Sequence, residues 1–348
     1  MKVGLLYGRN VFVTGIRRYA ECVEEGLRAA GDTAERVEIA RREWRIGKRR
    51  VGGFVSFWAA RFRHAPRGYD VVHALDPALA LPGTDVVTIH DLVLEEYPEW
   101  YQRDLGSRVD IRINRALGRR VPFLIAVSEA TKRAVVERWR VDPERVVVVP
   151  HGVDHDTFRP VERRSKHLAE GKRNLVFLGV NNPRKNILYA VKVVEALARE
   201  HGVQARLLRL GPDQFPDVAR EYRAYAAQAG VELVEPGFLD DEELASILTH
   251  ADAFLWPPVA EGFGIPVLEA MACGLPVVAR DLPINREVCG ELAFYHGDAV
   301  REGAEALVRC LEARPDPAPL RAHARQFTWE RTVRETRAVY ERAREARR

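Results

Sequence analysis

The stretch from Trp256 to Val278 most constrains what this chain can fold into. An apolar run that starts at Ala253 and ends at two prolines is typical of a strand, and a glycine-bearing loop follows it. Pro266 suits the first turn of a helix, where its missing N–H costs nothing, and Gly274 suits the end of that helix. The order strand, loop, helix, strand predicts a parallel α/β unit. In such a sheet the loop lies at the carboxyl ends of strands, where ligands bind.

The same loop combines features that suit a phosphate and a polyol. Free N–H groups at a helix start favour an anion such as phosphate. Two carboxylates, Glu261 and Glu269, flank the turn. Because acids do not hold phosphate, we expect these two to accept hydrogen bonds from hydroxyls, as on a sugar or a ribose. Phosphate and polyol together are what a nucleotide sugar presents.

Length and composition limit the class of protein. A chain of 348 residues is too long for one ordinary core and suits two domains. The net charge of +4 is too mild to indicate nucleic acid, and no nucleic-acid partner is expected. Four scattered cysteines without a C-x-x-C pair argue against structural zinc or a disulfide framework. The first residues enter a strand directly, without signal-peptide architecture, which favours a cytoplasmic location.

The N-terminal half opens as the first unit of a doubly wound domain. A strand from Lys2 to Leu6 leads through a loop into helical spacing that stops at Gly31. The G-x-G-x-x-G fingerprint is absent, so NAD is not expected. Gly15 either offers a backbone N–H to a phosphate or belongs to an ordinary strand-to-helix turn, and its position leaves both interpretations open.

His90 follows the apolar strand Val86 to Ile89 directly. It is either a polar group on the ligand side of the sheet or a satisfied core histidine. Further along, residues 95–120 have a helical pattern, and Ser128 suits the N-cap of the helix that follows it.

A basic and aromatic segment covers residues 41–67. Between Arg36 and Arg67 the chain has ten Lys or Arg against two Glu. Bulky apolar residues recur at helical spacing, namely Phe54, Phe57, Trp58 and Phe62. We favour a crossover helix that packs this stripe on the sheet. The alternative is an interfacial helix that docks on anionic lipid.

The second half repeats the strand–helix alternation after a polar segment, residues 159–172, that is typical of a linker. Arg184 and Lys185 stand near the head of its first helix, where cations oppose the helix dipole. This mismatch favours an anion site over a solvated helix start. Asp240 and Glu243 predict a capping box for the next helix but one, in preference to a metal site. We expect domains over 1–160 and 173–325, and a helix over 326–348 that crosses back to the first domain.

These residues resemble a known family. The run from Glu261 to Glu269 resembles the E-x7-E signature of retaining glycosyltransferase family 4, the mannosyltransferase-like group 1 glycosyltransferases. Further matches to the family occur at 87–92, 126–131, 149–154 and 236–244. The resemblance covers nearly the whole chain. It implies an α/β GT-B fold, in which two Rossmann-like domains face each other across a cleft, the first binding acceptor and the second nucleotide sugar.

The resemblance also implies roles for individual residues. Glu261 is expected to bind the donor sugar and Glu269 the ribose. Lys185, with Arg184, is expected to neutralise the diphosphate, and His90 to lie near the transferred sugar. The remaining binding positions that it implies are Gly15 at the phosphate, Gly237 and Phe238 at the base, and Gly262, Phe263 and Gly264 at the sugar and diphosphate.

The sequence departs from the family at two of these places. The glycine-rich turn of many members is reduced here to a single glycine, Gly15, and Val180 stands where many members have arginine. The second departure assigns more of the phosphate binding to Arg184 and Lys185.

The expected reaction is transfer of a hexose, mannose or glucose, from a nucleotide diphosphate sugar to a hydroxyl of a saccharide or lipid-linked saccharide. Retention at the anomeric carbon is implied by the resemblance, and we expect neither metal nor any cofactor besides the donor. Two alternatives remain, a nucleotide-sugar epimerase of the same fold and a non-catalytic nucleotide-sugar binder. Peripheral contact with an anionic membrane through 41–67, at its inner face, would suit a lipid-linked acceptor.

Overall fold

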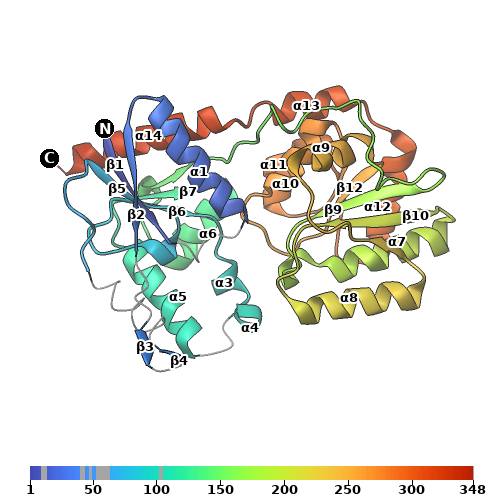
Figure 1. The fold of residues 1–348 in the computed structure, drawn as a ribbon, viewed down its shortest axis with the longest axis horizontal. Helices are drawn as coiled ribbons and strands as arrows, with labels where there is room; N and C mark the ends of the chain where they lie inside the picture. Colours follow the sequence, from blue (N-terminus) through green and yellow to red (C-terminus); the bar gives the residue numbers. More distant parts are fainter. Residues whose placement is uncertain (9–13, 40–43, 47–48, 52–62, 102–104, 348) are drawn as a thin grey trace. The chain divides into compact units, whose positions relative to one another are not determined.

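The computed structural model describes residues 1–8, 14–39, 44–46, 49–51, 63–101 and 105–347 (Figure 1). It divides into two compact units, unit 1 (Met1–His151 and Trp329–Arg348) and unit 2 (Gly152–Thr328). The division falls at His151 rather than at the expected residue 160. Within unit 2, the N–H of Val153 donates to the carbonyl of Phe327 over 3.2 Å.

Unit 1 contains a six-stranded sheet of order β2-β1-β5-β6-β7-β8, in which every pairing is parallel. Its strands are β1 (Lys2–Tyr7), β2 (Thr33–Glu38), β5 (Val71–Ala74), β6 (Val86–Ile89), β7 (Phe123–Ala126) and β8 (Val146–Val148). All residues of β5 and β6 are buried, because helices cover both faces of an all-parallel sheet. The strand order reverses between β1 and β5.

Two helices from opposite ends of the chain cover one face of this sheet. Residues of α1 (Thr14–Ala29) and α14 (Trp329–Ala346) share a core cluster with β1 and β5. Figure 1 shows α14, at the red end of the chain, running beside α1. The other face is covered by α6 (Glu129–Trp139), whose Val135 and Trp139 are buried. The C-terminal helix is therefore part of the core of unit 1.

Unit 2 contains a second all-parallel sheet of six strands, ordered β11-β10-β9-β12-β13-β14. Its strands are β9 (Arg173–Leu178), β10 (Ala205–Leu210), β11 (Glu232–Val234), β12 (Ala253–Trp256), β13 (Val277–Arg280) and β14 (Phe294–His296). Counted along the chain this order is 3-2-1-4-5-6, the Rossmann arrangement. It reverses between β9 and β12, and ligands of such sheets bind at the carboxyl ends of the strands flanking that point.

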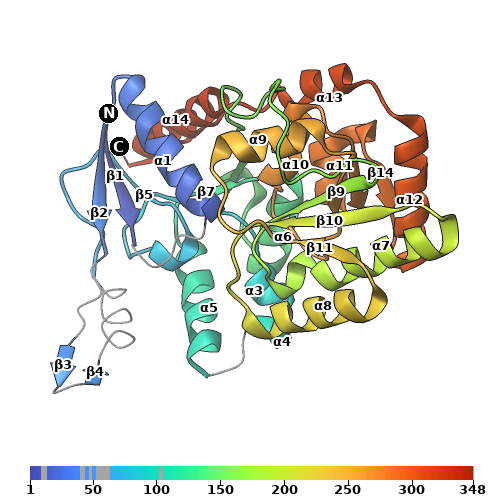
Figure 2. The same cartoon turned by 45° about the vertical axis from the view of Figure 1, so that its right-hand side comes forward.

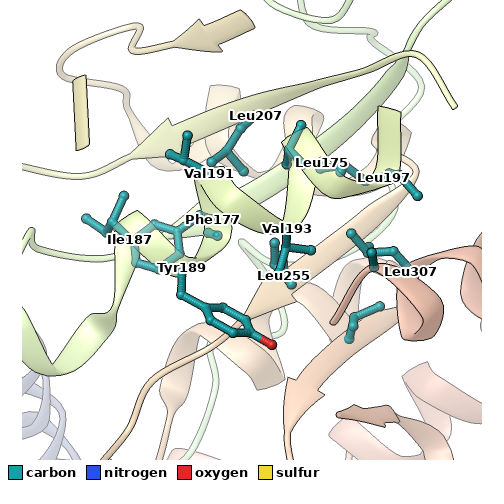
Figure 3. Packing of buried hydrophobic residues seen from close by; sticks show 14 of the residues in the cluster. Leu175, Phe177, Ile187, Tyr189, Val191, Val193, Leu197, Leu207, Leu255 and Leu307 are labelled. Carbon is teal, nitrogen blue, oxygen red and sulfur yellow. The ribbon is translucent and has the colours of Figure 1, made fainter. Parts of the chain in front are cut away.

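Helices cover both faces of the second sheet, as Figure 2 shows. One face carries α7 (Ile187–His201), α8 (Pro216–Ala229) and α12 (Val300–Ala313), and the other carries α9 (Asp241–His250), α10 (Ile265–Cys273), α11 (Pro283–Cys289) and α13 (Pro317–Ala324). In Figure 3, apolar side chains of α7 pack against Leu175, Phe177, Leu207 and Leu255 of the strands and Leu307 of α12. The predicted doubly wound α/β architecture is thus confirmed in both units.

The predicted N-cap at Ser128 is present, and of the predicted capping box the Asp240 half is present, whereas the Glu243 carboxylate binds residues outside α9. Ser128 Oγ accepts from the N–H of Thr131 over 2.9 Å at the start of α6. Asp240 Oδ1 accepts from the N–H of Glu243 over 2.8 Å at the start of α9. The carboxylate of Glu243 is bound by Ser165 Oγ at 2.5 Å and by Arg163, which lowers its pKa. Glu243 therefore ties the polar 159–172 segment to α9.

The continuous helix expected over 95–120 is wrong. The described residues of this stretch form α3 (Val93–Glu96), α4 (Pro98–Tyr101) and α5 (Leu105–Gly118), with a break at Tyr97 and with 102–104 outside the described residues. Pro98 causes the first interruption, since proline lacks an N–H and its ring disfavours helical geometry in the preceding residue.

The basic 41–67 segment is described only in part. It includes a short antiparallel pair, β3 (Trp44–Ile46) and β4 (Arg49–Val51), where a crossover helix was favoured. The apolar stripe from Phe54 to Phe62 lies outside the described residues. Within the part of the chain that the structure describes, no helix has the length and apolar character needed to cross a bilayer.

Candidate functional site

Three charged side chains meet at the switch point of unit 2. Arg184 and Lys185 lie in the connection after β9, and Glu261 lies in the connection after β12. Lys185 Nζ donates to Glu261 Oε2 over 2.5 Å, and an Arg184 guanidinium nitrogen lies 3.0 Å from the same oxygen. Two neighbouring parallel strands thus deliver both cations and their carboxylate to one edge of the sheet.

A tight turn positions the two cations. Residues Pro183–Lys185 form one 3-10 turn, in which the N–H of Arg184 donates to the side chain of Asn182 over 3.2 Å. Asn186 then adopts a left-handed conformation with φ of 57°, which asparagine tolerates better than most residues. Helix α7 begins immediately afterwards, so Arg184 and Lys185 precede it by less than one turn.

Burial and charge determine the ionisation of Glu261. Its side chain is 9 % exposed, and this burial disfavours the charged form. Arg184 and Lys185 outweigh the burial and lower the pKa of Glu261 to about 2. Glu261 is therefore a carboxylate at neutral pH. With two cations and one carboxylate, the cluster carries a net charge of +1, which suits an anionic ligand.

The loop after Glu261 leads into the start of α10. Gly262, Phe263 and Gly264 are all buried, and Gly264 caps the helix in a left-handed conformation with φ of 96°. A Cβ on Gly264 would lie 3.8 Å from Glu261 Cγ, so the turn and the carboxylate are neighbours. In the first turn of α10, Pro266 has no N–H and the N–H of Val267 donates to the carbonyl of Gly264 over 2.9 Å. The helix dipole is therefore the feature that makes this end favourable for an anion.

Glu269 and the 237–238 loop belong to the same unit. Glu269 lies inside α10 and is 4 % exposed. Gly237 and Phe238 lie in the connection between β11 and α9, also at the carboxyl ends of the strands. The Phe238 side chain is 97 % exposed, and Gly237 has φ of 84°. The roles expected for these residues stay predictions.

Gly15 and His90 belong to unit 1. Gly15 is the second residue of α1, is exposed, and a Cβ there would meet nothing within 4 Å. His90 follows β6, and its Nε2 donates to the carbonyl of Leu75 over 2.8 Å. Its Nδ1 lies 3.3 Å from Nε2 of His151. Since the carbonyl can only accept, a neutral His90 uses Nδ1 as an acceptor, and His151 donates to it.

Both histidines are held neutral. Burial lowers the pKa of His90, although the nearby carboxylates of Asp76 and Asp91 oppose this. Burial and the proximity of His90 hold the pKa of His151 well below its ordinary value. The two rings stack with centroids 5.4 Å apart, and Tyr19 of α1 packs on both, at 5.1 Å and 4.9 Å. His90 is thus fixed in one neutral form.

Sequence reasoning missed the residues that hold these groups in place. His151 lies three residues after the end of β8, at a carboxyl end of the same sheet, a signal that was available in the sequence. Beneath them, His73 of β5 contacts Tyr340 of α14 at 2.7 Å and Thr88 of β6 at 2.8 Å. No short motif marks this network, because its members are far apart in the chain.

Two Rossmann-like units, with a cationic cluster at the switch point of the second, are the architecture of GT-B glycosyltransferases. Residues 158–326 match the family described as Glycosyl transferases group 1, and residues 15–157 match Glycosyltransferase Family 4. The chain therefore belongs to the group 1 glycosyltransferases. It is an enzyme that transfers a sugar, and the expected family and GT-B fold are confirmed.

Individual relatives agree with this assignment. The MMP alpha-(1->4)-mannosyltransferase of Mycolicibacterium hassiacum is 30 % identical over 316 residues, covering 83 % of this chain and 74 % of that protein. The D-inositol 3-phosphate glycosyltransferase of Actinosynnema mirum is 31 % identical over 328 residues, covering 82 % and 75 %. The structure of Anabaena HepE in complex with UDP-glucose matches with a TM-score of 0.72 and 17 % identity, covering 96 % of this chain and 97 % of that one.

Proposed function

We propose that the chain transfers a hexose, mannose or glucose, from a nucleotide diphosphate sugar to a hydroxyl of a saccharide or lipid-linked saccharide. The observation that carries this is the cluster of Arg184, Lys185 and Glu261 at the switch point of unit 2. It offers positive charge for a diphosphate beside a carboxylate for sugar hydroxyls. The mannosyltransferase relative and the UDP-glucose bound to HepE support a hexose donor of this kind.

In the proposed mechanism the anomeric configuration is retained. The bond between the anomeric carbon and the diphosphate oxygen breaks, and the acceptor oxygen bonds to the same face of that carbon. The acceptor proton passes to the departing diphosphate. Arg184, Lys185 and the start of α10 stabilise the negative charge on that leaving group, a purely electrostatic and positional form of catalysis. This assignment needs neither a metal ion nor a separate cofactor.

The other proposed contacts are assigned to separate parts of the donor. Glu261 binds hydroxyls of the sugar, and Glu269 binds those of the ribose. Gly237 and Phe238 line the base, and the backbone from Gly262 to Gly264 faces the sugar and diphosphate. In unit 1, His90 serves the transferred sugar and Gly15 the phosphate. Both ring nitrogens of His90 are engaged, Nε2 by the Leu75 carbonyl and Nδ1 by His151, so a sugar hydroxyl that donates to Nδ1 replaces the longer contact with His151.

A donor panel tests the proposal. GDP-mannose, UDP-glucose and ADP-glucose are screened by thermal shift, since a ligand that binds the folded state raises Tm. The stabilising donor is then incubated with saccharide and lipid-linked acceptors, and the product anomer is identified by NMR. Lys185→Ala is expected to lower transfer by about a hundredfold or more. Lys172→Ala, which removes a surface lysine paired with Glu232, is the matched control.

The same assay separates the two alternatives. Formation of an epimeric nucleotide sugar without acceptor would identify an epimerase. Donor binding without any transfer or epimer formation would identify a binder. Inversion at the anomeric carbon would overturn the retaining mechanism and leave the glycosyltransferase assignment intact.

We further propose that the acceptor is presented at a membrane surface, with the protein cytoplasmic and peripheral at the inner face. The support is the excess of basic over acidic residues in 41–67, a charge pattern that attracts anionic lipid. Co-sedimentation with vesicles of phosphatidylcholine alone and with added phosphatidylglycerol tests this. Binding that needs the anionic lipid and weakens with salt is the expected result. Equal amounts of protein in the pellet with both kinds of vesicle would overturn the proposed membrane contact.

A further inference from the structure

A buried tryptophan lies directly beneath the proposed diphosphate-binding lysine. Trp256 is the last residue of β12, one of the two strands that flank the switch point, and it is 0 % exposed. The Nζ atom of Lys185 lies 4.2 Å from the centroid of its ring. A cation over the face of an aromatic ring at this distance is attracted by the electron density of the π system, most strongly when the ring is tryptophan.

The ring is held in one orientation by its neighbours. Phe254 stacks on it at 5.7 Å with an interplanar angle of 24°, and Phe177 at 6.3 Å with 30°. The indole edge faces the loop, because a Cβ on Gly264 would lie 3.7 Å from Nε1. Trp256 thus presents its face to Lys185 and its N–H edge to the turn at the start of α10.

The need for a second anchor follows from the geometry of Glu261. Both cations contact the same oxygen of this carboxylate. Arg184 is also tied to the loop by a hydrogen bond to the carbonyl of Ala260 over 3.1 Å. When sugar hydroxyls engage Glu261, its hold on Lys185 weakens. The indole is neutral and buried, so the ligand does not compete for it as it does for the Glu261 carboxylate. The attraction of the ring for the ammonium group of Lys185 therefore persists when the ligand binds.

We propose that Trp256 is a positioning residue, which holds the ammonium group of Lys185 in place for the diphosphate through its indole face. This rests on the proposed function, in which Lys185 binds that group. The proposed effect comes from the π electrons of the indole face and not from the volume of the side chain. An aliphatic residue of similar size would fill the core and leave the lysine with a larger range of positions.

Fluorinated tryptophans introduced at position 256 of the full chain test the proposal without emptying the core. Each fluorine withdraws electron density from the ring with little change in volume. The measurement is the Kd of whichever of GDP-mannose, UDP-glucose and ADP-glucose binds the unmodified protein most tightly, by calorimetry, with Tm as a check on folding. We expect the Kd to rise with each added fluorine. With trifluorotryptophan it should be about three- to tenfold higher than with tryptophan. Tm is expected to stay within a few degrees.

Two controls isolate the effect. The same fluorotryptophans at Trp139 alter another fully buried indole, in unit 1, whose Nε1 donates to Glu95 over 2.8 Å, and are expected to leave Kd unchanged. In a Lys185→Ala background the dependence on fluorine at 256 is expected to vanish, as coupling between contacting residues requires.

The indole N–H gives an opposite prediction. Nε1 of Trp256 has no hydrogen-bond partner among the described residues, so it is available to a ligand acceptor if the loop moves. Fluorine makes this N–H a stronger donor, so tighter binding along the series would overturn the role of the face. A flat series with Lys185→Ala still impaired would overturn the proposal for Trp256 alone. Unchanged binding in Lys185→Ala itself would overturn the assignment of Lys185 as well.

Discussion

Lys185 Nζ and Glu261 Oε2 lie 2.5 Å apart although 76 positions separate the two residues in the chain. The contact exists because β9 and β12 pair in parallel, Leu175 beside Ala253 and Val176 beside Phe254. Both residues follow the carboxyl ends of these strands. The register of two buried strands therefore decides where the charges of the candidate site meet.

Glu261 makes stability depend on pH in a defined direction. Its pKa in the folded state is about 2, below the ordinary value of a glutamate. Its contribution to folding is therefore fully present above the unfolded pKa, near pH 5 and higher. It is lost as the pH falls toward 2. A depression of this size corresponds to about 3 kcal/mol.

Urea unfolding of the parent and Glu261→Gln between pH 7 and pH 3 measures this contribution. Glu261→Gln is expected to be less stable by about 3 kcal/mol at pH 7, since it leaves Arg184 and Lys185 without their carboxylate. The gap between the two proteins is expected to narrow as the pH falls. A gap that stays constant down to pH 3 would contradict the charge interaction.

The same substitution is expected to separate ligand binding from transfer. Glu261→Gln removes a negative charge beside the proposed diphosphate position, so nucleoside diphosphate should bind at least as tightly as to the parent. Transfer should fall about a hundredfold, because the amide orients sugar hydroxyls less well. Lys185→Ala should weaken both. Lys192→Ala, on α7 with its ammonium over the Tyr225 ring, is the control and should change neither.

The individual members of this cluster could be predicted from the sequence, but their contacts could not. Arg184 and Lys185 drew attention because cations near a helix start oppose its dipole, and Glu261 because it precedes a glycine-rich helix entry. Local patterns do not state which strands pair, so nothing in the sequence placed Glu261 against Lys185. Trp256 illustrates the same limit. The sequence shows Trp256 only as the end of an apolar strand, and the fold is needed to show Lys185 above its ring.

Two other features that the sequence interpretation missed are indicated by nearby residues in the chain. Pro98 divides the helical pattern over 95–120, and its effect on the preceding residue is predictable from its covalent structure. His151 lies three residues after the end of β8, at the same carboxyl edge of the sheet as His90. By contrast, His73 lies inside β5 and pairs with Tyr340, 267 positions away, which only the docking of α14 on unit 1 reveals.

His73 is expected to make unit 1 sensitive to mild acid. Burial, with a smaller effect of His90, lowers its pKa to about 3. A histidine with a depressed folded pKa stabilises the fold above its unfolded pKa, near 6.5, and this stability is lost as the pH falls below that value. Between pH 7 and pH 5 the loss is about 2 kcal/mol.

Calorimetric Tm values of the parent and His73→Gln at pH 7 and pH 5 test this. Glutamine keeps polar atoms for Tyr340 and Thr88 but does not titrate, so the variant should lose less stability on acidification than the parent. His64→Gln, at an exposed position of the same unit, is the control and should behave as the parent does. Equal losses in all three proteins would assign the acid sensitivity to other groups.

The hydrogen bond from His151 is expected to fix the tautomer of His90. His151→Gln retains an N–H donor at the position of Nε2 for His90 Nδ1, whereas His151→Leu removes it. In ¹⁵N NMR spectra of the imidazole side chains, the parent and His151→Gln should show His90 protonated at Nε2 at pH 7. His151→Leu should show a mixture, and should transfer sugar more slowly than His151→Gln. A single Nε2–H tautomer in His151→Leu would show that the Leu75 carbonyl alone suffices.

Gly264 is expected to be needed for function beyond its contribution to stability. Its φ of 96° strains any residue with a Cβ, at a cost of about 1–2 kcal/mol. A Cβ there would also lie 3.7 Å from Trp256 Nε1 and 3.8 Å from Glu261 Cγ, so relief of the strain moves the loop that carries the carboxylate.

Gly171 offers a matched control in unit 2, since its φ is 75° and a Cβ would meet nothing within 4 Å. Gly264→Ala and Gly171→Ala should lose similar free energies of unfolding in urea. Only Gly264→Ala should lose transfer activity, by about tenfold or more, which is the factor that corresponds to a strain of this size. Equal activity in the two variants would mean that the turn before α10 tolerates displacement, and that Glu261 is not held in place by it.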